Sequence, residues 1–279
     1  MFSHNLISPT ALMVAHLRSY SNIPYSKEID ELYEAKSAFL EIAGKRADEF
    51  LFTAVWMELR YQSLTNSIKD HGCDNIIEIA AGLSPRGLNY TRNNNAVRYV
   101  EIDLPEMIEG KRRMMQFYKE QIREGYLRLC EVDIFSKSGL HSAAEHLEGS
   151  ICVINEGLLD YLTMDEKSTL ALNIHDLLSQ RGGSWLTSDL FYPSMVHLNS
   201  AMREVMENMS KIIKRNLPGN FFESLASAEK FYRDLGFEIK RLNQRDLVKK
   251  LQSLSQVEIT PQELWHILSF SYLWVLKPR

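Results

Sequence analysis

The stretch that most constrains this fold is Asn75–Gly87, which reads NIIEIAAGLSPRG. Its β-branched residues favour a buried strand over Asn75–Ile79. The next residues, Ala80–Ser84, are small, so a ligand can approach the backbone closely. A helix beginning near Pro85 would then present free N–H groups to an anionic or polar group. A strand, a tight turn and a helix in this order are typical of the nucleotide-binding corner of an open α/β sheet.

Further strands follow this corner at spacings that suit βα repeats. They are predicted at Val97–Asp103, Leu127–Asp133, Ser150–Asn155, Ser184–Asp189, Phe237–Leu242 and Phe270–Leu276. Strands this continuously apolar indicate a parallel sheet that is covered on both faces. We therefore expect an α/β, Rossmann-like sheet of seven strands, with the last strand antiparallel beside the fifth and sixth.

Helices are predicted before, between and after these strands. Apolar stripes place helices in a cap over residues 1–70, among them one from Asp48 to Lys69. Thr163 and Glu166 have the spacing of a capping box, which begins a helix over Asp165–Ser179. The remaining helices are expected at Pro85–Asn93, Pro105–Arg123, Ser227–Leu235, Gln244–Leu254 and Pro261–His266. We expect a single domain over 1–279, made of the cap (1–70), a cofactor-binding core (71–189), a Met-rich helical insertion or lid (190–222) and a C-terminal part of the same sheet (223–279).

Composition narrows the classes of function. The net charge of −4 argues against a nucleic-acid surface, which is usually basic. No apolar run approaches the roughly 18 residues of a membrane helix, and no signal peptide is expected. Three cysteines without a spacing pattern favour free thiols and a cytoplasmic location. The eight histidines show no metal-binding spacing, so no metal is expected. The oligomeric state stays open.

Acidic residues stand at or near the carboxyl ends of the first five predicted strands. They are Glu78, Asp103, Asp133, Glu156 and Asp189. Open α/β sheets bind ligands at this edge. A carboxylate there can accept hydrogen bonds from ribose hydroxyls or from an adenine amino group. Each residue taken singly can also be a turn former or a helix cap.

The turn lacks the G-x-G-x-x-G fingerprint of dinucleotide-binding proteins, which argues against a nicotinamide-dependent oxidoreductase. It resembles the E-x-G-x-G-x-G turn of class I S-adenosylmethionine-dependent methyltransferases, with Ala80 and Ser84 in two glycine places. Over nearly the whole chain the sequence is similar to the leucine carboxyl methyltransferase family, including its bacterial branch of polyketide-type O-methyltransferases. The segments that carry this resemblance are Thr10–Arg18, Glu78–Arg86, Tyr99–Pro105 followed by Lys111, Glu156–Leu162 and Gly182–Asp189.

The resemblance implies S-adenosyl-L-methionine as the cofactor and a defined set of contacts to it. In that set Ala80 and Gly82 line the methionyl part, Asp103 holds the ribose, and Glu156 lies at the methionyl amino end. Asp133 and Ile134 hold the adenine. Arg60, or alternatively Arg18, reaches the methionyl carboxylate. The full implied set is Arg60, Glu78, Ala80, Gly82, Asp103, Leu104, Asp133, Ile134, Glu156 and Gly157.

The expected reaction is methylation of a carboxyl or hydroxyl group on a small molecule. A carboxylate needs no general base, whereas a hydroxyl benefits from one. Tyr161, Tyr192 and His197 are candidates on the acceptor side, although aromatic residues at such places often only pack. The Met-rich residues of 190–222 can line an acceptor pocket or form an ordinary helix core. A protein C-terminal carboxylate as acceptor, and a non-catalytic cofactor-binding relative, stay as alternatives.

Overall fold

The computed structural model describes residues 7–121, 126–189 and 199–279 of the chain. Its described strands form one seven-stranded sheet in the order β3-β2-β1-β4-β5-β7-β6. The strands are β1 (Asn75–Ile79), β2 (Arg98–Asp103), β3 (Leu127–Glu131), β4 (Ile151–Asn155), β5 (Gly183–Thr187), β6 (Phe237–Asn243) and β7 (Tyr272–Pro278). Strands β1 to β5 pair in parallel, and β7 is antiparallel to both β5 and β6. The predicted Rossmann-like sheet with its closing antiparallel strand is confirmed.

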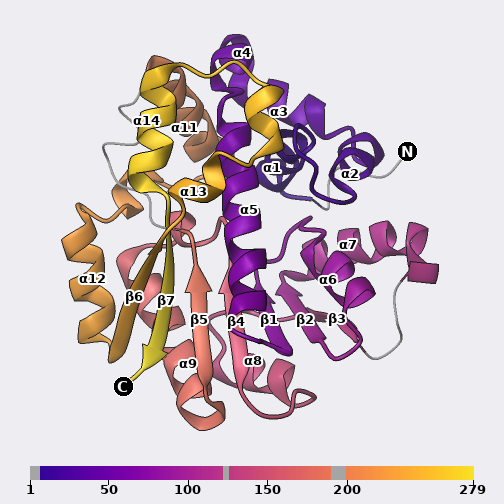
Figure 1. The fold of residues 1–279 in the computed structure, drawn as a ribbon, viewed down its shortest axis with the longest axis vertical. Coiled ribbons are helices and arrows are strands. Elements are labelled where there is room, and N and C mark those ends of the chain that lie inside the picture. Colours follow the sequence, from indigo (N-terminus) through magenta and orange to yellow (C-terminus); the bar gives the residue numbers. More distant parts are fainter. Residues whose placement is uncertain (1–6, 122–125, 190–198) are drawn as a thin grey trace.

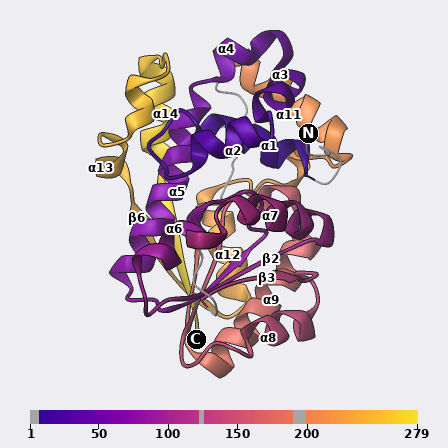
Figure 2. The same ribbon diagram turned by 90° about the vertical axis from the view of Figure 1, so that its right-hand side faces the viewer.

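Helices cover both faces of the sheet and gather above one end of it (Figure 1). Around the sheet lie α5 (Thr53–Asp70), α6 (Arg86–Asn93), α7 (Pro105–Phe117), α8 (Lys137–Ala144), α9 (Met164–Arg181) and α12 (Leu225–Asp234). Figure 2 shows α5 on one side of the strands and α8 and α9 on the other. Above the carboxyl ends of the parallel strands lie α1 (Pro9–Arg18), α2 (Ser26–Leu32), α3 (Ala35–Ala43), α4 (Ala47–Phe50), α11 (Ser200–Ile213), α13 (Arg245–Val248) and α14 (Pro261–Phe270).

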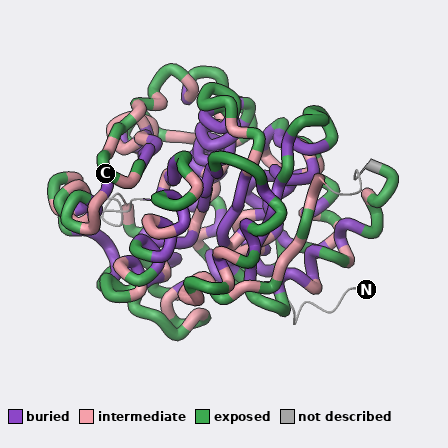
Figure 3. The backbone as a smooth tube through the Cα atoms, turned by 90° about the horizontal axis from the view of Figure 1, so that it is seen from below, coloured by how far each residue is buried: buried purple, intermediate pink, exposed green. Residues whose placement is uncertain are grey.

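Buried residues run through the middle of the molecule, with exposed segments around them (Figure 3). The inner strands are buried along their length, as β4 illustrates, which is why they read as continuous apolar runs. A separate apolar cluster joins the cap to the sheet helices, because Leu12 of α1 packs with Leu88 of α6 and Met114 of α7. The cap is therefore held directly against the half of the sheet that carries β1, β2 and β3.

Some predicted helix boundaries are wrong. The helix predicted from Asp48 to Lys69 is divided, because α4 ends at Phe50 and α5 begins at Thr53. The helix predicted over Gln244–Leu254 is also interrupted: α13 ends at Val248, and a 3₁₀ turn follows over Gln252–Ser255. There the buried Glu58 of α5 accepts hydrogen bonds from the backbone N–H of Gln252 and Ser253, at 3.2 and 2.8 Å. These N–H groups are thus satisfied by a side chain instead of by a continuing helix.

The ends of the chain's last elements also differ from the prediction. Helix α14 extends to Phe270, so the last strand begins at Tyr272 and runs to Pro278. All seven predicted strands, the last one included, agree with the structure to within two residues at each end. Among the helices described, none combines the length and the apolar character that a membrane crossing requires.

Candidate functional site

A cavity of about 440 Å³ lies where the carboxyl ends of the parallel strands meet the helical cap. Its sheet side is lined by the residues that follow β1, β2, β3 and β4, namely Ala80–Leu83, Asp103–Leu104, Val132–Phe135 and Glu156–Leu158. Its cap side is lined by α1, α5 and α11. Open α/β sheets place ligand sites at this edge. Among the predicted site residues in the described chain, all except Glu78 line this cavity.

The turn after β1 holds the carboxylate of Asp103 in place. Ala80 and Gly82 both have left-handed backbone conformations, with φ of +51° and +53°. The Gly82 N–H donates to Asp103 Oδ2 at 2.7 Å, and the Leu104 N–H donates to Asp103 Oδ1 at 2.8 Å. Burial raises the pKa of Asp103, and these two N–H groups oppose that effect. A carboxylate has about four lone-pair sites, so Asp103 keeps acceptor capacity for ligand hydroxyls.

The rim beside β3 combines one carboxylate with apolar surface. Asp133 is exposed, and its Oδ1 accepts one hydrogen bond at 2.9 Å, from the Phe135 N–H. Ile134 and Phe135 line the cavity next to it, and so does Leu104, which is 58% exposed. Apolar side chains beside a free carboxylate oxygen suit a flat heterocycle that carries an amino group.

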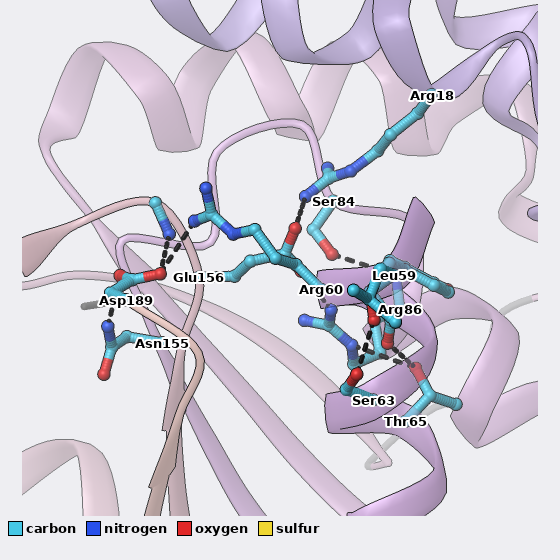
Figure 4. A network of polar contacts seen from close by, with 12 residues as sticks. Arg18, Leu59, Arg60, Ser63, Thr65, Ser84, Arg86, Asn155, Glu156 and Asp189 are labelled. Carbon is cyan, nitrogen blue, oxygen red and sulfur yellow. Dashed lines mark hydrogen bonds and ion pairs between the residues drawn. The ribbon is translucent and has the colours of Figure 1, made fainter. Parts of the chain in front are cut away.

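Glu156, directly after β4, lies between two arginines (Figure 4). Its Oε1 is 2.7 Å from Nη2 of Arg18 in α1, and its Oε2 is 2.5 Å from Nη2 of Arg86 in α6. Burial by itself would raise the pKa of Glu156, but Arg18, Arg86 and Arg60 outweigh it and lower this pKa to about 2. The group is therefore an anion at neutral pH, and it ties the cap helix α1 to the sheet.

Glu78 lies outside the cavity lining, unlike the cofactor contact that the turn motif implies. Its Oε1 pairs with Arg86, and its Oε2 accepts a hydrogen bond from the Tyr99 hydroxyl at 2.7 Å. The Arg86 guanidinium also lies 4.5 Å from the centre of the Tyr61 ring. Both oxygens of Glu78 are thus engaged, one by Arg86 and the other by Tyr99, so this placement gives Glu78 a supporting role for the turn.

Both arginines predicted as alternatives for the methionyl carboxylate line the cavity. Arg60 comes from α5, and its Nη2 is 2.7 Å from Asp189 Oδ1. Arg18 binds Glu156 as described, and the Nε groups of both arginines are buried without a hydrogen-bond partner among the described residues. Buried guanidinium donors of this kind suit a ligand carboxylate. Arg18 and Arg60 therefore both stay candidates for binding the methionyl carboxylate.

Of the three residues predicted as acceptor-side candidates, Tyr161 lines the cavity. Burial raises its pKa, and a hydrogen bond with Thr10 opposes this only in part. Tyr161 therefore keeps its proton at neutral pH. Tyr192 and His197, the other two acceptor-side candidates, lie outside the described residues.

Met202, Met206 and Met209 of α11 are buried in the core and also line the cavity, so the helix-core interpretation is confirmed and the acceptor-pocket interpretation stays a prediction. The basic residues near this helix are mostly solvated, because Arg203, Lys211 and Lys214 are exposed. Arg215 lines the cavity and pairs with Glu166 at 2.7 Å.

Arg86 does not line the cavity but pairs with Glu156, which does, and sequence reasoning missed this contact apart from including Arg86 in the turn motif. A signal for it does exist in the sequence. Arg86 is the first residue of α6, where the helix dipole disfavours a positive charge. A basic residue at such a position indicates a carboxylate partner elsewhere in the fold, and Glu78 and Glu156 are these partners.

Comparison with known proteins agrees with this geometry. The family model for leucine carboxyl methyltransferases matches residues 25–175, which is more than half of the chain. A comparison with curated protein sequences finds no match.

Solved structures of methyltransferases share the fold at low sequence identity. The methyltransferase domain of bacterial CtHen1 has a TM-score of 0.53 at 10% identity, over 79% of this chain and 97% of that one. PigF with SAH has a TM-score of 0.51 at 12% identity, over 90% of this chain and 61% of that one. An O-methyltransferase family protein from Burkholderia thailandensis has a TM-score of 0.50 at 14% identity, over 85% and 61%. This chain thus spans less than two thirds of the length of the last two proteins.

The family match covers most of the cap, the turn after β1 and the carboxyl ends of β2, β3 and β4, and so includes the sheet side of the cavity. The resemblance found in the sequence is thereby confirmed. The chain belongs to the leucine carboxyl methyltransferase family of S-adenosylmethionine-dependent methyltransferases.

Proposed function

We propose that this protein is an O-methyltransferase that acts on a carboxyl or hydroxyl group of an apolar small molecule. The observation that carries the proposal is the composition of the cavity. Polar residues at the strand ends line one side of it, and apolar side chains of α1, α5 and α11 line the other. A cofactor with polar ends and an apolar acceptor would then share one cavity.

The residues on the sheet side fit S-adenosylmethionine. Asp103 would accept from the ribose hydroxyls, and Asp133 and Ile134 would hold the adenine. The methionyl carboxylate would lie near Arg18 and Arg60, whose buried Nε groups have no partner among the described residues. The structure of PigF, which is similar in fold, was solved with SAH.

The cap side fits an apolar acceptor. Its wall includes Trp56 and Met57 of α5 and the α11 methionines Met202, Met206 and Met209. Methionine side chains adapt to irregular apolar shapes, so this wall suits a bulky or flexible molecule.

Held by Asp103, Asp133 and the two arginines, the cofactor would supply an electrophilic methyl group for transfer to the acceptor oxygen and would leave as S-adenosylhomocysteine. The chain's own residues would align the acceptor oxygen with that methyl group and exclude water. A carboxylate attacks without losing a proton. A hydroxyl must release its proton to a base, and Tyr161 is poorly suited to accept one because its raised pKa keeps it protonated.

Calorimetry with S-adenosylhomocysteine and with NADH tests the cofactor site. Asp103→Ala is expected to weaken the binding of S-adenosylhomocysteine by about 1–3 kcal/mol, the cost of losing a hydrogen-bonding partner. Asp234→Ala is the matched control, because that side chain is 60% exposed and lies far along the chain in α12. Binding of NADH without binding of S-adenosylhomocysteine would refute the proposal.

Transfer of a labelled methyl group to extracts identifies the acceptor. Alkali-labile label in the small-molecule fraction indicates an ester, and alkali-stable label indicates an ether. Alkali-labile label on a protein would instead support methylation of a C-terminal carboxylate. Tight cofactor binding with no transfer to any fraction would favour a non-catalytic relative.

A further inference from the structure

One buried carboxylate beneath the cavity binds several elements together. Asp189 follows β5 and is 2% exposed. It accepts hydrogen bonds from Arg60 Nη2, Asn155 Nδ2 and the backbone N–H groups of Gly157, Leu158 and Leu159. Four of these contacts are 2.7 Å long, and the Leu159 contact is 3.3 Å. Donors from α5, from β4 and from the loop after β4 thus converge on one side chain (Figure 4).

Three of the five residues that donate to Asp189 line the cavity, although Asp189 itself does not. Arg60, Gly157 and Leu158 are all part of the cavity lining. Gly157 has a φ of +78°, and a Cβ at this position would lie 3.1 Å from Arg60 Nη2. Arg60 therefore packs directly on Gly157, and Asp189 Oδ1 bonds both of them.

The amide of Asn155 has a defined orientation in this arrangement. Its Oδ1 accepts a hydrogen bond from Trp185 Nε1 at 2.6 Å, which directs its Nδ2 toward Asp189. Oδ2 of Asp189 consequently faces donors only: this amide and the N–H groups of Leu158 and Leu159.

We propose that Asp189 is a positioning residue that sets the geometry of Arg60 and of the loop Gly157–Leu159 toward the methionyl end of the cofactor. This inference rests on the proposed placement of the cofactor. Asp189 acts through the groups it holds, because it does not line the cavity. Its carboxylate compensates the Arg60 charge and satisfies three backbone N–H groups of the loop.

Asp189→Asn separates this role from the overall fold. An asparagine keeps the shape of the side chain but replaces one carboxylate oxygen by an NH₂ group. In one orientation of the amide this NH₂ faces the donors that now bind Oδ2, and in the flipped orientation it faces Arg60 and Gly157. In either orientation, some N–H groups of the loop lose the oxygen to which they now donate. Loss of hydrogen bonds to a charged group is expected to weaken S-adenosylhomocysteine binding about tenfold or more.

Glu58→Gln provides a matched control on the same helix as Arg60. Glu58 is 1% exposed, and its carboxylate also accepts hydrogen bonds from backbone N–H groups, those of Gln252 and Ser253. It does not line the cavity. Glu58→Gln should therefore lower stability through the same chemistry and leave cofactor affinity unchanged.

The experiment combines calorimetry with S-adenosylhomocysteine and hydrogen exchange on the full chain, at a temperature where all variants are folded. Asp189→Asn is expected to bind S-adenosylhomocysteine about tenfold more weakly. The backbone amides of Gly157–Leu159 should exchange faster in this variant. Glu58→Gln should match the wild type in both measurements. Wild-type affinity in Asp189→Asn would overturn the inference, and so would an equal loss in Glu58→Gln. A wild-type chain that fails to bind S-adenosylhomocysteine would instead overturn the proposed cofactor site.

Discussion

Replacing Glu156 by glutamine tests the ionic contacts that hold α1 to the sheet. The side chain of Glu156 is 2% exposed, and it lies 2.7 Å from Arg18 and 2.5 Å from Arg86. Its pKa falls from 4.5 to about 2 despite burial. A pKa difference of this size corresponds to about 3 kcal/mol of stabilisation of the charged form, because one pKa unit equals about 1.36 kcal/mol. Glu156→Gln should therefore lower the free energy of unfolding at neutral pH by about 3 kcal/mol.

The pH dependence of this loss follows from the direction of the pKa change. The native pKa of Glu156 lies below the unfolded value, so the unfolded state binds more protons between the two values. The stabilisation is complete above the unfolded pKa of 4.5 and is lost as the pH falls towards about 2. The difference between wild type and Glu156→Gln should shrink over this range, because the glutamine variant has no proton to gain.

Urea unfolding followed by far-UV circular dichroism, between about pH 7 and about pH 3, measures this difference. Glu148→Gln is the control, because that side chain is 85% exposed and 3.6 Å from Arg98, and surface pairs of this kind contribute little. A loss below about 1 kcal/mol for Glu156→Gln at neutral pH would contradict the reasoning. A loss that stays constant with pH would also refute it, since the charge would then not be its source.

Three other changes have defined outcomes in urea unfolding. Ala80→Gly should raise the free energy of unfolding by up to about 1 kcal/mol, because Ala80 has a φ of +51°, and a decrease would contradict the assigned strain. Gly87→Ala should lower the free energy of unfolding by about 1–3 kcal/mol, because the new Cβ would lie 2.3 Å from the buried Glu101 Oε1. An unchanged free energy of unfolding would show that the Glu101 side chain can move aside. Burial lowers the pKa of Lys167 to about 8, so the native state releases its proton before the unfolded state does. The stability of wild type relative to Lys167→Met should consequently rise between about pH 8 and about pH 10. A difference that does not change with pH would show that Lys167 is not the group that loses its proton early in the native state.

The order of strands and helices could be predicted because its signals are local. The capping box at Thr163 is an example, since its hydroxyl accepts from the Glu166 N–H at 3.2 Å and its own N–H donates to Glu166 Oε2 at 2.8 Å. Both partners lie within one helical turn, so their spacing is visible in the sequence. The interruption of the helix predicted over Gln244–Leu254 could not be predicted in this way. The N–H groups there donate to Glu58, which lies nearly two hundred residues earlier in the chain.

The buried ion pair of Lys111 and Glu101 could not be predicted for the same physical reason. Lys111 follows the YVEIDLP segment in the resemblance, but its role is not readable from that position. The structure shows Lys111 Nζ 2.5 Å from Glu101 Oε2, with both side chains buried. Burial raises the pKa of Glu101 to about 7, although Lys111 opposes this. A periodicity of apolar residues carries no information about which charges are buried together.

The acidic series at the strand ends divides into residues that line the cavity and residues that do not. All five residues lie at or near the edge where a sheet of this kind binds ligands, yet they differ in whether they line the cavity and in which donors they already hold. Glu78 is occupied by Arg86 and Tyr99, and Asp189 accepts from five donors.

Asp103 and Asp133 differ from these two residues, because the described chain gives them only backbone N–H contacts. They keep acceptor capacity and line the cavity, which is why they are the stronger candidates for the ribose and the adenine. The donors that Glu78 and Asp189 hold come mostly from residues more than twenty positions away in the chain. A place in the cavity lining, and not position at a strand end alone, therefore separates the candidate ligand-binding acids from the supporting ones.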